Sequence, residues 1–366
     1  MSCRGKVMDY LDVRFGFRDL LHHNFTEYLL PRTINAWYAL GAVLLVLFAI
    51  QFISGILLLV YYIPDTEHAF ESVQTIMNDV PFGWLIRYVH AIGANVIVLA
   101  LLLHLLSVLF MSAYKDPREI TWVFGFLIFL TSLGMSFTGY LLPWSQLSYW
   151  ATVVGTNMPE AVPVIGEELV LFLRGGPSVG QQTLSRFFAL HVMGFPFIFG
   201  LLLFVHLFLV RRIGVSIPPF GPTYRPEPPP KEFRHPEYPG GIPFFPNYVT
   251  KDLAMIYLFL TLLMAVVFFA PWIFLPAQAF EPADPFTTPA GIKPEWYFLA
   301  PYQILRIFPN KTAGILVQLA FLLFLFVLPF IDRSMERRPA RRPVFVSIFI
   351  ITLLIFIGLT VWGSVS

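Results

Sequence analysis

Seven long apolar stretches constrain the fold of this chain more than any other feature of its sequence. They occupy residues 34–62, 85–111, 120–141, 186–213, 252–276, 312–331 and 343–363. Each is long enough to cross about 30 Å of hydrocarbon as a helix. Backbone groups find no water inside a bilayer, and the stretches are too continuously apolar for barrel strands, so they predict an all-α transmembrane bundle. A charged fraction of only 13% agrees, since soluble domains are about one-quarter charged.

The basic residues predict which side of the membrane each loop faces. Seven spans put the termini on opposite sides, and 18 of the 24 Lys and Arg residues then fall on the N-terminal side. The positive-inside rule therefore predicts a cytoplasmic N-terminus. The polar start of the chain predicts no cleavable signal peptide. A net charge of only +2 gives no reason to expect nucleic-acid binding.

We divide the chain into four parts by its apolar pattern. These are a cytoplasmic N-terminal segment (1–33), a four-helix domain (34–213), a proline-rich cytoplasmic linker (214–251) and a three-helix domain (252–366). The linker run PPFGPTYRPEPPPKEFRHP predicts extended backbone. The outward loops at 142–185 and 277–311 are rich in aromatic residues, so we expect them to fold against the bundle at the membrane surface.

Four of the eight histidines lie inside the apolar stretches, where a polar ring is costly. His90 and His104 are 14 residues apart on the second span, and His191 and His206 are 15 apart on the fourth. At about 100° and 1.5 Å per residue, each pair returns to nearly the same helix face about 21–22 Å further along. Because both spans run in the same direction, the sequence predicts an outer tier (His90, His191) and an inner tier (His104, His206).

Each tier suits a haem clamped between two helices by bis-imidazole ligation of its iron. The alternative for any single membrane histidine is an interhelical hydrogen bond. Glycines repeat with the same period, and an absent Cβ lets a wide group approach the backbone, although helix packing explains glycines as well. These are Gly41 and Gly55 on the first span and Gly125 and Gly139 on the third. Since Cys3 is the only cysteine, a Cys-ligated cluster made by this chain alone is excluded.

Together with the segments GYLLPW (139–144) and PEWY (294–297), these pairs resemble cytochrome b of the cytochrome bc complexes from about residue 30 onward. Several details are similar to the cytochrome b6f branch, whose front and back halves are separate chains. They include the 15-residue histidine step, the run PVIGEELVLFLRGGPSVGQQTLSRF and only three spans after the fourth. That branch attaches an extra haem to a cysteine near the start of the first span. This chain has Ala39 there, so we predict no such haem.

The resemblance implies a quinol-oxidising electron-transfer subunit with two non-covalent b haems and two quinone sites. Quinol oxidation would be bifurcated at the outer face, and quinone would be reduced at the inner face after electron transfer through the haems, with proton translocation. The implied partners are a Rieske-type iron–sulfur protein, a c-type cytochrome, a second copy of the subunit and membrane lipids. The implied location is a bacterial inner membrane or an equivalent energy-transducing membrane.

At the outer site, the resemblance makes Glu295 the acceptor of a quinol proton. Tyr140 and Tyr302 would line the same pocket. Phe137 would form its aromatic wall, although core packing is the safer interpretation of one ring in a chain with 39 phenylalanines. A carboxylate in so apolar a loop should have a raised pKa. The alternative for Pro294 and Glu295 is the first turn of a short helix, with the carboxylate serving the helix dipole.

Two arginines near the outer histidines, Arg87 and Arg186, are expected to pair with haem propionates, or alternatively to lie at the membrane interface. For the inner tier the family often has an arginine three residues after the ligand. This chain has Ser107 there, which leaves Arg118 as a candidate.

At the inner site, the resemblance implies that Lys251 and Asp252 form the proton-donating position. It also implies that Arg211 stabilises the quinone carbonyl or a semiquinone anion. A helix start with Asp252 near its cap fits the sequence equally well.

Two other functions compete with this one. A di-haem membrane anchor without bifurcation explains the histidines but not the PEWY segment. A transporter with proton-relaying histidines predicts interrupted helices and no haem.

Overall fold

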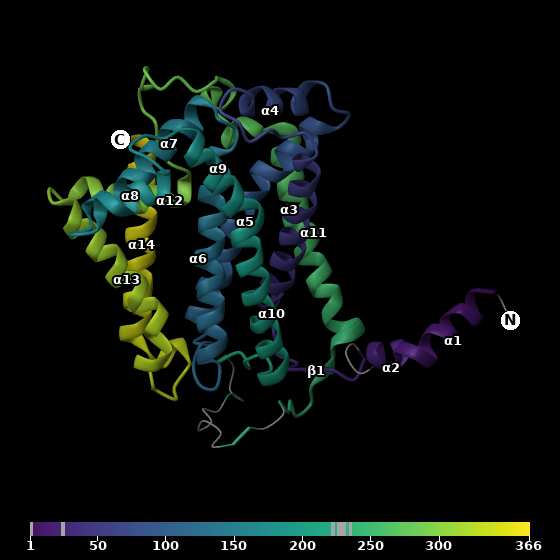
Figure 1. The fold of residues 1–366 in the computed structure, drawn as a ribbon. Coiled ribbons are helices and arrows are strands. Elements are labelled where there is room, and N and C mark those ends of the chain that lie inside the picture. The colour runs from purple at the N-terminus through teal and green to yellow at the C-terminus, as the bar shows by residue number, and fades with distance from the viewer. Residues whose placement is uncertain (1–2, 23–25, 221–223, 225–231, 234–235) are drawn as a thin grey trace.

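The computed structural model describes residues 3–22, 26–220, 224, 232–233 and 236–366, and it has seven helical spans that are long and apolar enough to cross a membrane (Figure 1). The spans are α3 (Leu40–Leu59), α5 (Gly83–Phe110), α6 (Glu119–Leu141), α9 continuing into α10 (Gln181–Ala189 and Phe195–Ile213), α11 (Val249–Phe269), α13 (Lys311–Ile331) and α14 (Pro343–Val365). The predicted all-α bundle of seven spans is confirmed.

The first four spans form two helix pairs that face each other. Helix α3 packs along α5, and α6 packs along α10, whereas contact between the pairs is sparse. Helix α11 covers α3 and α5. Helix α13 packs on α6. Helix α14 packs against the short helix α12 (Trp296–Ile307), and most of its apolar side chains are exposed, as a lipid-facing helix requires (Figure 1).

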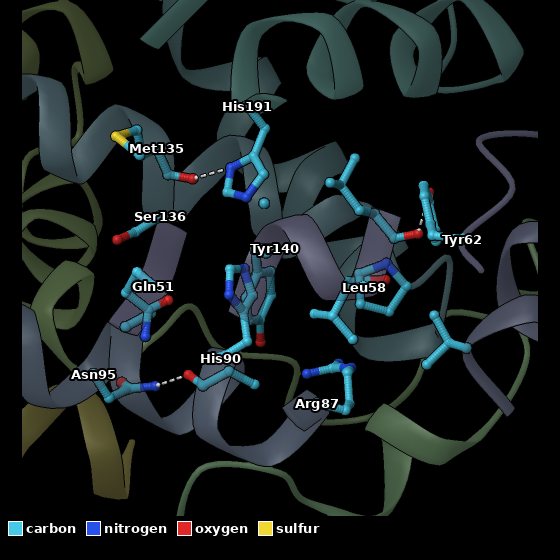
Figure 2. A pocket seen from close by; sticks show the side chains of 18 of the residues that line it. Gln51, Leu58, Tyr62, Arg87, His90, Asn95, Met135, Ser136, Tyr140 and His191 are labelled. Atoms are coloured by element: carbon cyan, nitrogen blue, oxygen red, sulfur yellow. Dashed lines mark hydrogen bonds between the residues drawn. The ribbon is translucent and has the colours of Figure 1, made fainter. Parts of the chain in front are cut away.

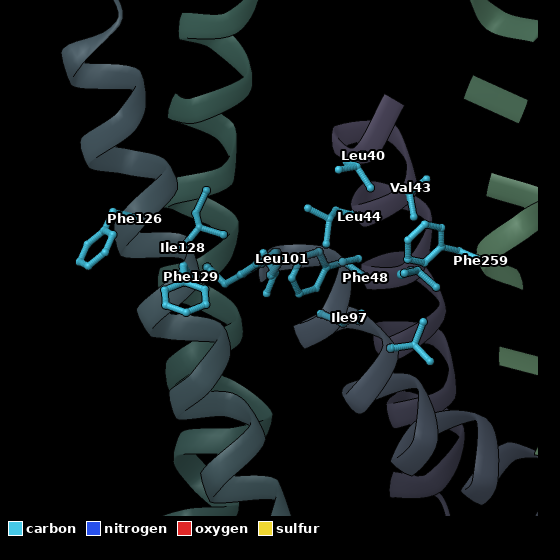
Figure 3. Packing of buried hydrophobic residues seen from close by; sticks show 14 of the residues in the cluster. Leu40, Val43, Leu44, Phe48, Ile97, Leu101, Phe126, Ile128, Phe129 and Phe259 are labelled. Atoms are coloured by element: carbon cyan, nitrogen blue, oxygen red, sulfur yellow. The ribbon is translucent and has the colours of Figure 1, made fainter. Parts of the chain in front are cut away.

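Apolar side chains fill the middle of the bundle. Phe48 of α3 and Phe199 of α10 bring their ring centroids within 4.3 Å, and both are buried. Ile97 of α5, also buried, lies midway between His90 and His104 in sequence. Figure 3 shows Phe48 and Ile97 in this packed cluster. A close-packed layer therefore separates the outer from the inner histidines.

A proline explains one contact between the front and back halves. Pro329 of α13 has no N–H, so the carbonyl of Leu325 loses its usual helical donor. The indole Nε1 of Trp122 on α6 donates to that carbonyl at 2.9 Å. Within a bilayer, such a freed carbonyl needs a new partner, and this one joins α6 to α13.

The predicted fifth span, 252–276, was wrong at its ends. Helix α11 begins at Val249 and stops at Phe269, where Ala270 leaves helical geometry and Pro271 opens a short 3₁₀ turn, Pro271–Ile273. Proline cannot donate to the carbonyl four residues before it, so the helix ends there although the sequence stays apolar.

Short helices cover the outer end of the bundle, as expected for loops of such apolar composition. They are α4 (Ala69–Asn78), α7 (Gln146–Asn157), α8 (Gly166–Arg174) and α12 (Trp296–Ile307) (Figure 1). The buried amide of Gln146 ties the two outer loops together. It donates to the carbonyl of Thr287 at 2.8 Å and accepts from the N–H of Asp284 at 2.7 Å.

The opposite end carries helices α1 (Cys3–Phe15) and α2 (Phe17–Leu21), which project from the bundle (Figure 1). A two-residue antiparallel pair joins β1 (Leu29–Leu30) to β2 (Ile242–Pro243). The side chain of Cys3 and most of the proline-rich run at 218–236, predicted to be extended, lie outside the described part of the chain.

Candidate functional site

The outer histidines face each other across the bundle. The ring centroids of His90 on α5 and His191 on the fourth span lie 6.2 Å apart, with the rings at 86° to each other (Figure 2). Bonds from an imidazole nitrogen to a transition metal are about 2 Å long. Two such bonds, plus the distance from each nitrogen to its ring centre, span roughly this separation. The outer tier therefore has the spacing of two ligands on one metal ion.

Hydrogen bonds fix which nitrogen of each outer ring is free. His191 Nδ1 lies 2.9 Å from the carbonyl of Met135, and a carbonyl only accepts, so Nδ1 carries the proton. His90 Nδ1 lies 3.0 Å from Ser54 Oγ, whose own hydrogen goes to the carbonyl of Ile50 at 2.7 Å. His90 Nδ1 is therefore the donor as well. In both rings Nε2 is left with its lone pair, the arrangement of metal-binding histidines.

The inner tier shows the same arrangement on one side. His206 Nδ1 donates to the carbonyl of Thr121 at 3.0 Å, which again leaves Nε2 for a metal. His104 is close enough to His206 to interact with it electrostatically. Its Nδ1 is buried, with no hydrogen-bond partner among the described residues. A neutral imidazole keeps a lone pair on one ring nitrogen, and among the described residues nothing takes up Nδ1 of His104, so this ring has a nitrogen free for a metal.

Three of the four glycines named in the sequence analysis lie directly against these histidine rings. A Cβ on Gly55 would lie 3.1 Å from His90, one on Gly125 3.0 Å from His206, and one on Gly139 only 2.4 Å from His191. A Cβ on Gly41 would meet no atom within 4 Å. The glycines therefore make room for the imidazoles themselves, whereas the sequence indicated only that something wide approaches.

A π-turn, Leu190–Gly194, interrupts the fourth span at His191. Pro196 lacks an N–H, so the carbonyl of Val192 has no donor four residues on and the helix widens here. Such turns occur often at functional sites. The local break in the helix accompanies the placement of His191 opposite His90.

A cavity of about 260 Å³ lies beside the outer tier, and Figure 2 shows Tyr140 and Arg87 around it with the two histidines. Both halves of the chain line it. The front half contributes His90, His191, Arg87, Tyr140 and Gly139, and the back half contributes Phe274, Leu275, Glu295 and Tyr297. One chamber therefore joins the histidine tier to the PEWY segment.

Glu295 precedes α12 as its N-cap residue, but its carboxylate makes no capping hydrogen bond. The side chain lines the cavity instead, and burial raises its pKa to about 7. It lies close enough to Tyr140 and Tyr297 to act on both electrostatically. A carboxyl group with this pKa exchanges protons readily at physiological pH.

Two residues expected at this site, Tyr302 and Arg186, do not line the cavity, and Phe137 lies in the aromatic core, which was its alternative. Tyr302 lines a neighbouring cavity of about 350 Å³ with Lys293 and Arg306. The guanidinium of Arg186 hydrogen-bonds the carbonyl of Phe172 and does not line the cavity. Phe137 packs against other aromatic rings of the core.

The expected inner-face residues gather near the start of α3 and the end of α10. Lys251 Nζ donates to the carbonyl of Ile34 at 3.3 Å. Asp252 Oδ1 is buried without a partner among the described residues. Arg211 stacks its guanidinium over Tyr28, 3.6 Å from the ring centroid. These contacts place a buried carboxylate and two cations at the inner end of the bundle.

Sequence reasoning missed the partners that orient the histidines. Met135 and Thr121 act through main-chain carbonyls, which carry no residue-type signal. Tyr297 was within reach, since it stands two residues after Glu295 in the PEWY segment. Ser54, next to Gly55, also faces His90.

Comparison with known proteins gives consistent matches along the chain. Residues 25–214 match the family model described as "Cytochrome b/b6/petB", and residues 282–366 match that described as "Cytochrome b(C-terminal)/b6/petD". Cytochrome b of Rickettsia prowazekii is 38% identical over 339 residues, covering 93% of this chain and 82% of that relative. Cytochrome b of Allochromatium vinosum is 39% identical over 334 residues, covering 89% of this chain and 80% of the relative.

A solved structure agrees with the sequence relatives. A chain of a "Hyperthermophilic respiratory Complex III" superposes with a TM-score of 0.89 at 38% identity, covering 98% of this chain and 91% of that one. The similarity therefore extends over both halves of the fold.

Proposed function

This chain belongs to the cytochrome b family, and we propose that its two histidine tiers hold two b haems. It is the cytochrome b subunit of a bc1-type respiratory complex III, which is a quinol:cytochrome c oxidoreductase. The observation that carries this proposal is the outer tier: two facing imidazoles 6.2 Å apart, each with Nδ1 hydrogen-bonded and Nε2 left for iron. The haems, when bound, accept single electrons and pass them across the membrane.

The four-helix front half would hold each haem between its helix pairs. His90 and His191 ligate the outer iron, and His104 and His206 the inner one. The carbonyls of Met135 and Thr121 keep the ring orientation of the α10-side ligands. The guanidinium of Arg87, which lines the outer cavity, is available to a propionate.

We propose that quinol is oxidised in the outer cavity. Glu295 takes one of its protons, because its carboxyl faces the chamber and has a pKa of about 7. Tyr140, on the α6 wall, confines the quinol ring beside Glu295. The second proton also leaves at the outer face. The two quinol electrons take separate paths, one to a Rieske-type iron–sulfur protein serving a c-type cytochrome and the other inward through the tiers.

At the inner face, quinone reduction requires protons from the cytoplasm. Asp252, which is half-buried and whose Oδ1 has no hydrogen-bond partner among the described residues, is the proposed donor, with Lys251 beside it. Arg211 is the proposed contact of the quinone carbonyl. We place this face in the cytoplasm from the distribution of basic residues, with the complex working as a dimer in an energy-transducing membrane.

Haem content tests this proposal. The purified complex should show a reduced-minus-oxidised spectrum of b-type haem, and pyridine-haemochrome assay should give two b haems per copy of this chain. Absence of b haem would contradict the proposal and favour a proton-relaying transporter. A count of one b haem per chain would show that one of the two tiers holds no haem.

A further inference from the structure

Two arginines from opposite halves of the chain lie at the turn that joins α5 to α6, Arg118 as part of it and Arg337 through hydrogen bonds to its carbonyls. Arg118 immediately precedes α6, and Arg337 lies in the loop 332–342 between α13 and α14. They are near enough for the charge of one to act on the other, and Tyr38 at the start of α3 lies near both. Two like charges held together in this way call for a shared anion.

Among the described residues, no carboxylate is shared by the two arginines, although Glu119 acts on Arg118 electrostatically. Arg118 donates to the carbonyls of Gly214 and Val215 at 3.0 and 3.1 Å, and Arg337 to those of Ser112 and Met111 at 3.1 and 3.2 Å. Both side chains are partly buried, and neither forms an ion pair with a carboxylate of the described chain. Burial lowers the pKa of both guanidiniums, and the charge of Arg337 lowers that of Arg118 further.

The acidic residues of the same loop already have partners. Lys115 Nζ donates to Asp332 at 2.8 Å, and the guanidinium of Arg342 also contacts Asp332. Although burial opposes it, the hydrogen bond from Lys115 helps to hold the pKa of Asp332 below its ordinary value. Glu336 pairs with Arg338 at 2.6 Å. These ion pairs fasten the loop to the turn after α5 and leave Arg337 without a carboxylate.

The two arginines bind the inner ends of the helices that carry the inner histidine tier: Arg118 contacts the end of α10, and Arg337 the end of α5. The carbonyl of Thr121 accepts the hydrogen bond from His206, and Arg118 is three residues earlier, about one helical turn away. The hydroxyl of Thr121 is itself buried and has no partner among the described residues. Ser107, three residues after His104, gives its hydroxyl hydrogen to the carbonyl of His104 at 2.8 Å and brings no charge. Two cations at the inner ends of these helices and an unpaired hydroxyl one turn from Arg118 therefore lie on the cytoplasmic side of this tier.

We propose that Arg337 of the C-terminal half, together with Arg118, binds a propionate carboxylate of the inner haem. The inference rests on the proposed function, because it needs a haem in the inner tier. Guanidinium groups form strong hydrogen bonds with carboxylates, and a carboxylate would supply the charge that both arginines lack. Through this contact, the back half of the chain sets the electrostatic potential at a haem held by the front half.

The redox potential of the inner haem tests the proposal on the purified complex. Removing a cation beside the haem favours its oxidised form. Arg337→Gln should therefore lower the ratio of reduced to oxidised inner haem at a fixed ambient potential by about three- to tenfold. Arg337→Lys, which keeps the charge, should give a smaller change. Arg338→Gln is the matched control, since it removes the same charge from the adjacent residue, whose partner is Glu336, and it should leave the ratio unchanged.

Several outcomes would overturn the proposal. One is an Arg337→Gln variant that keeps both haems and shows an unchanged redox potential of the inner haem. Another is an equal shift of that potential in the Arg338→Gln control. Loss of co-purifying phospholipid phosphorus in Arg337→Gln, without a change in potential, would make the pair a site for a lipid phosphate. If the parental complex held no b haem, the proposed function itself would fail, which separates the two tests.

Discussion

Replacing His90 or His191 with alanine is expected to remove the outer haem, and replacing His104 or His206 the inner haem, each without loss of the other. Each tier offers its metal two imidazoles, so one substitution removes half of the axial ligation. The close-packed layer around Phe48 and Phe199 separates the tiers, so the remaining site should keep its shape.

Pyridine-haemochrome assay of the purified variants should therefore give one b haem per chain instead of two. His68→Ala is the matched control, because His68 is exposed on the outer surface and hydrogen-bonds Asp65 at 2.9 Å. It should keep both haems. Any of the four tier variants that retained two haems would remove that histidine from the ligand set.

Glu295→Gln is expected to slow quinol-driven reduction of the outer haem by about 10²–10⁴, the usual contribution of a positioned general base. The amide keeps nearly the same volume and cannot accept the proton, while haem content should be unchanged. Stopped-flow reduction by quinol, with the inner quinone site inhibited, measures this step. Glu281→Gln, in the same loop with an exposed side chain, should react at the parental rate.

The pH dependence gives a second measure of Glu295. Its pKa of about 7 means that the proton-accepting carboxylate is lost as the pH falls below neutrality. Below a pH of about 7, the parental rate should therefore fall with decreasing pH, by up to tenfold per pH unit. Above this pH the rate should level off. The Glu295→Gln variant should lack this step. A Gln variant with the parental rate and profile would make Glu295 only the residue that begins α12.

The helical period explains why much of the bundle was predictable. A spacing of 14 or 15 residues fixes both the face and the depth of a side chain, so His90 and His191 could be placed opposite each other from sequence alone. The same period brought Gly55, Gly125 and Gly139 to the histidine rings.

Loop residues have no such period, so sequence reasoning could not place their side chains. Arg186 and Tyr302 are near the outer site in sequence, but they point to the carbonyl of Phe172 and to a neighbouring cavity. The pairing of Arg337 with Arg118 joins residues more than 200 positions apart, and it depends on the ion pairs of Asp332. Such contacts arise from tertiary packing.

Splitting of the two quinol electrons is tested most directly by an oxidant pulse. The complete complex is supplied with quinol while the inner site is inhibited, and a one-electron oxidant is then added to the iron–sulfur partner. If the electrons take separate paths, removing the first forces the second into this chain, so the b haems should become more reduced when oxidant is added. If the b haems kept the same redox state or became more oxidised, quinol oxidation would not be bifurcated at the Glu295 cavity.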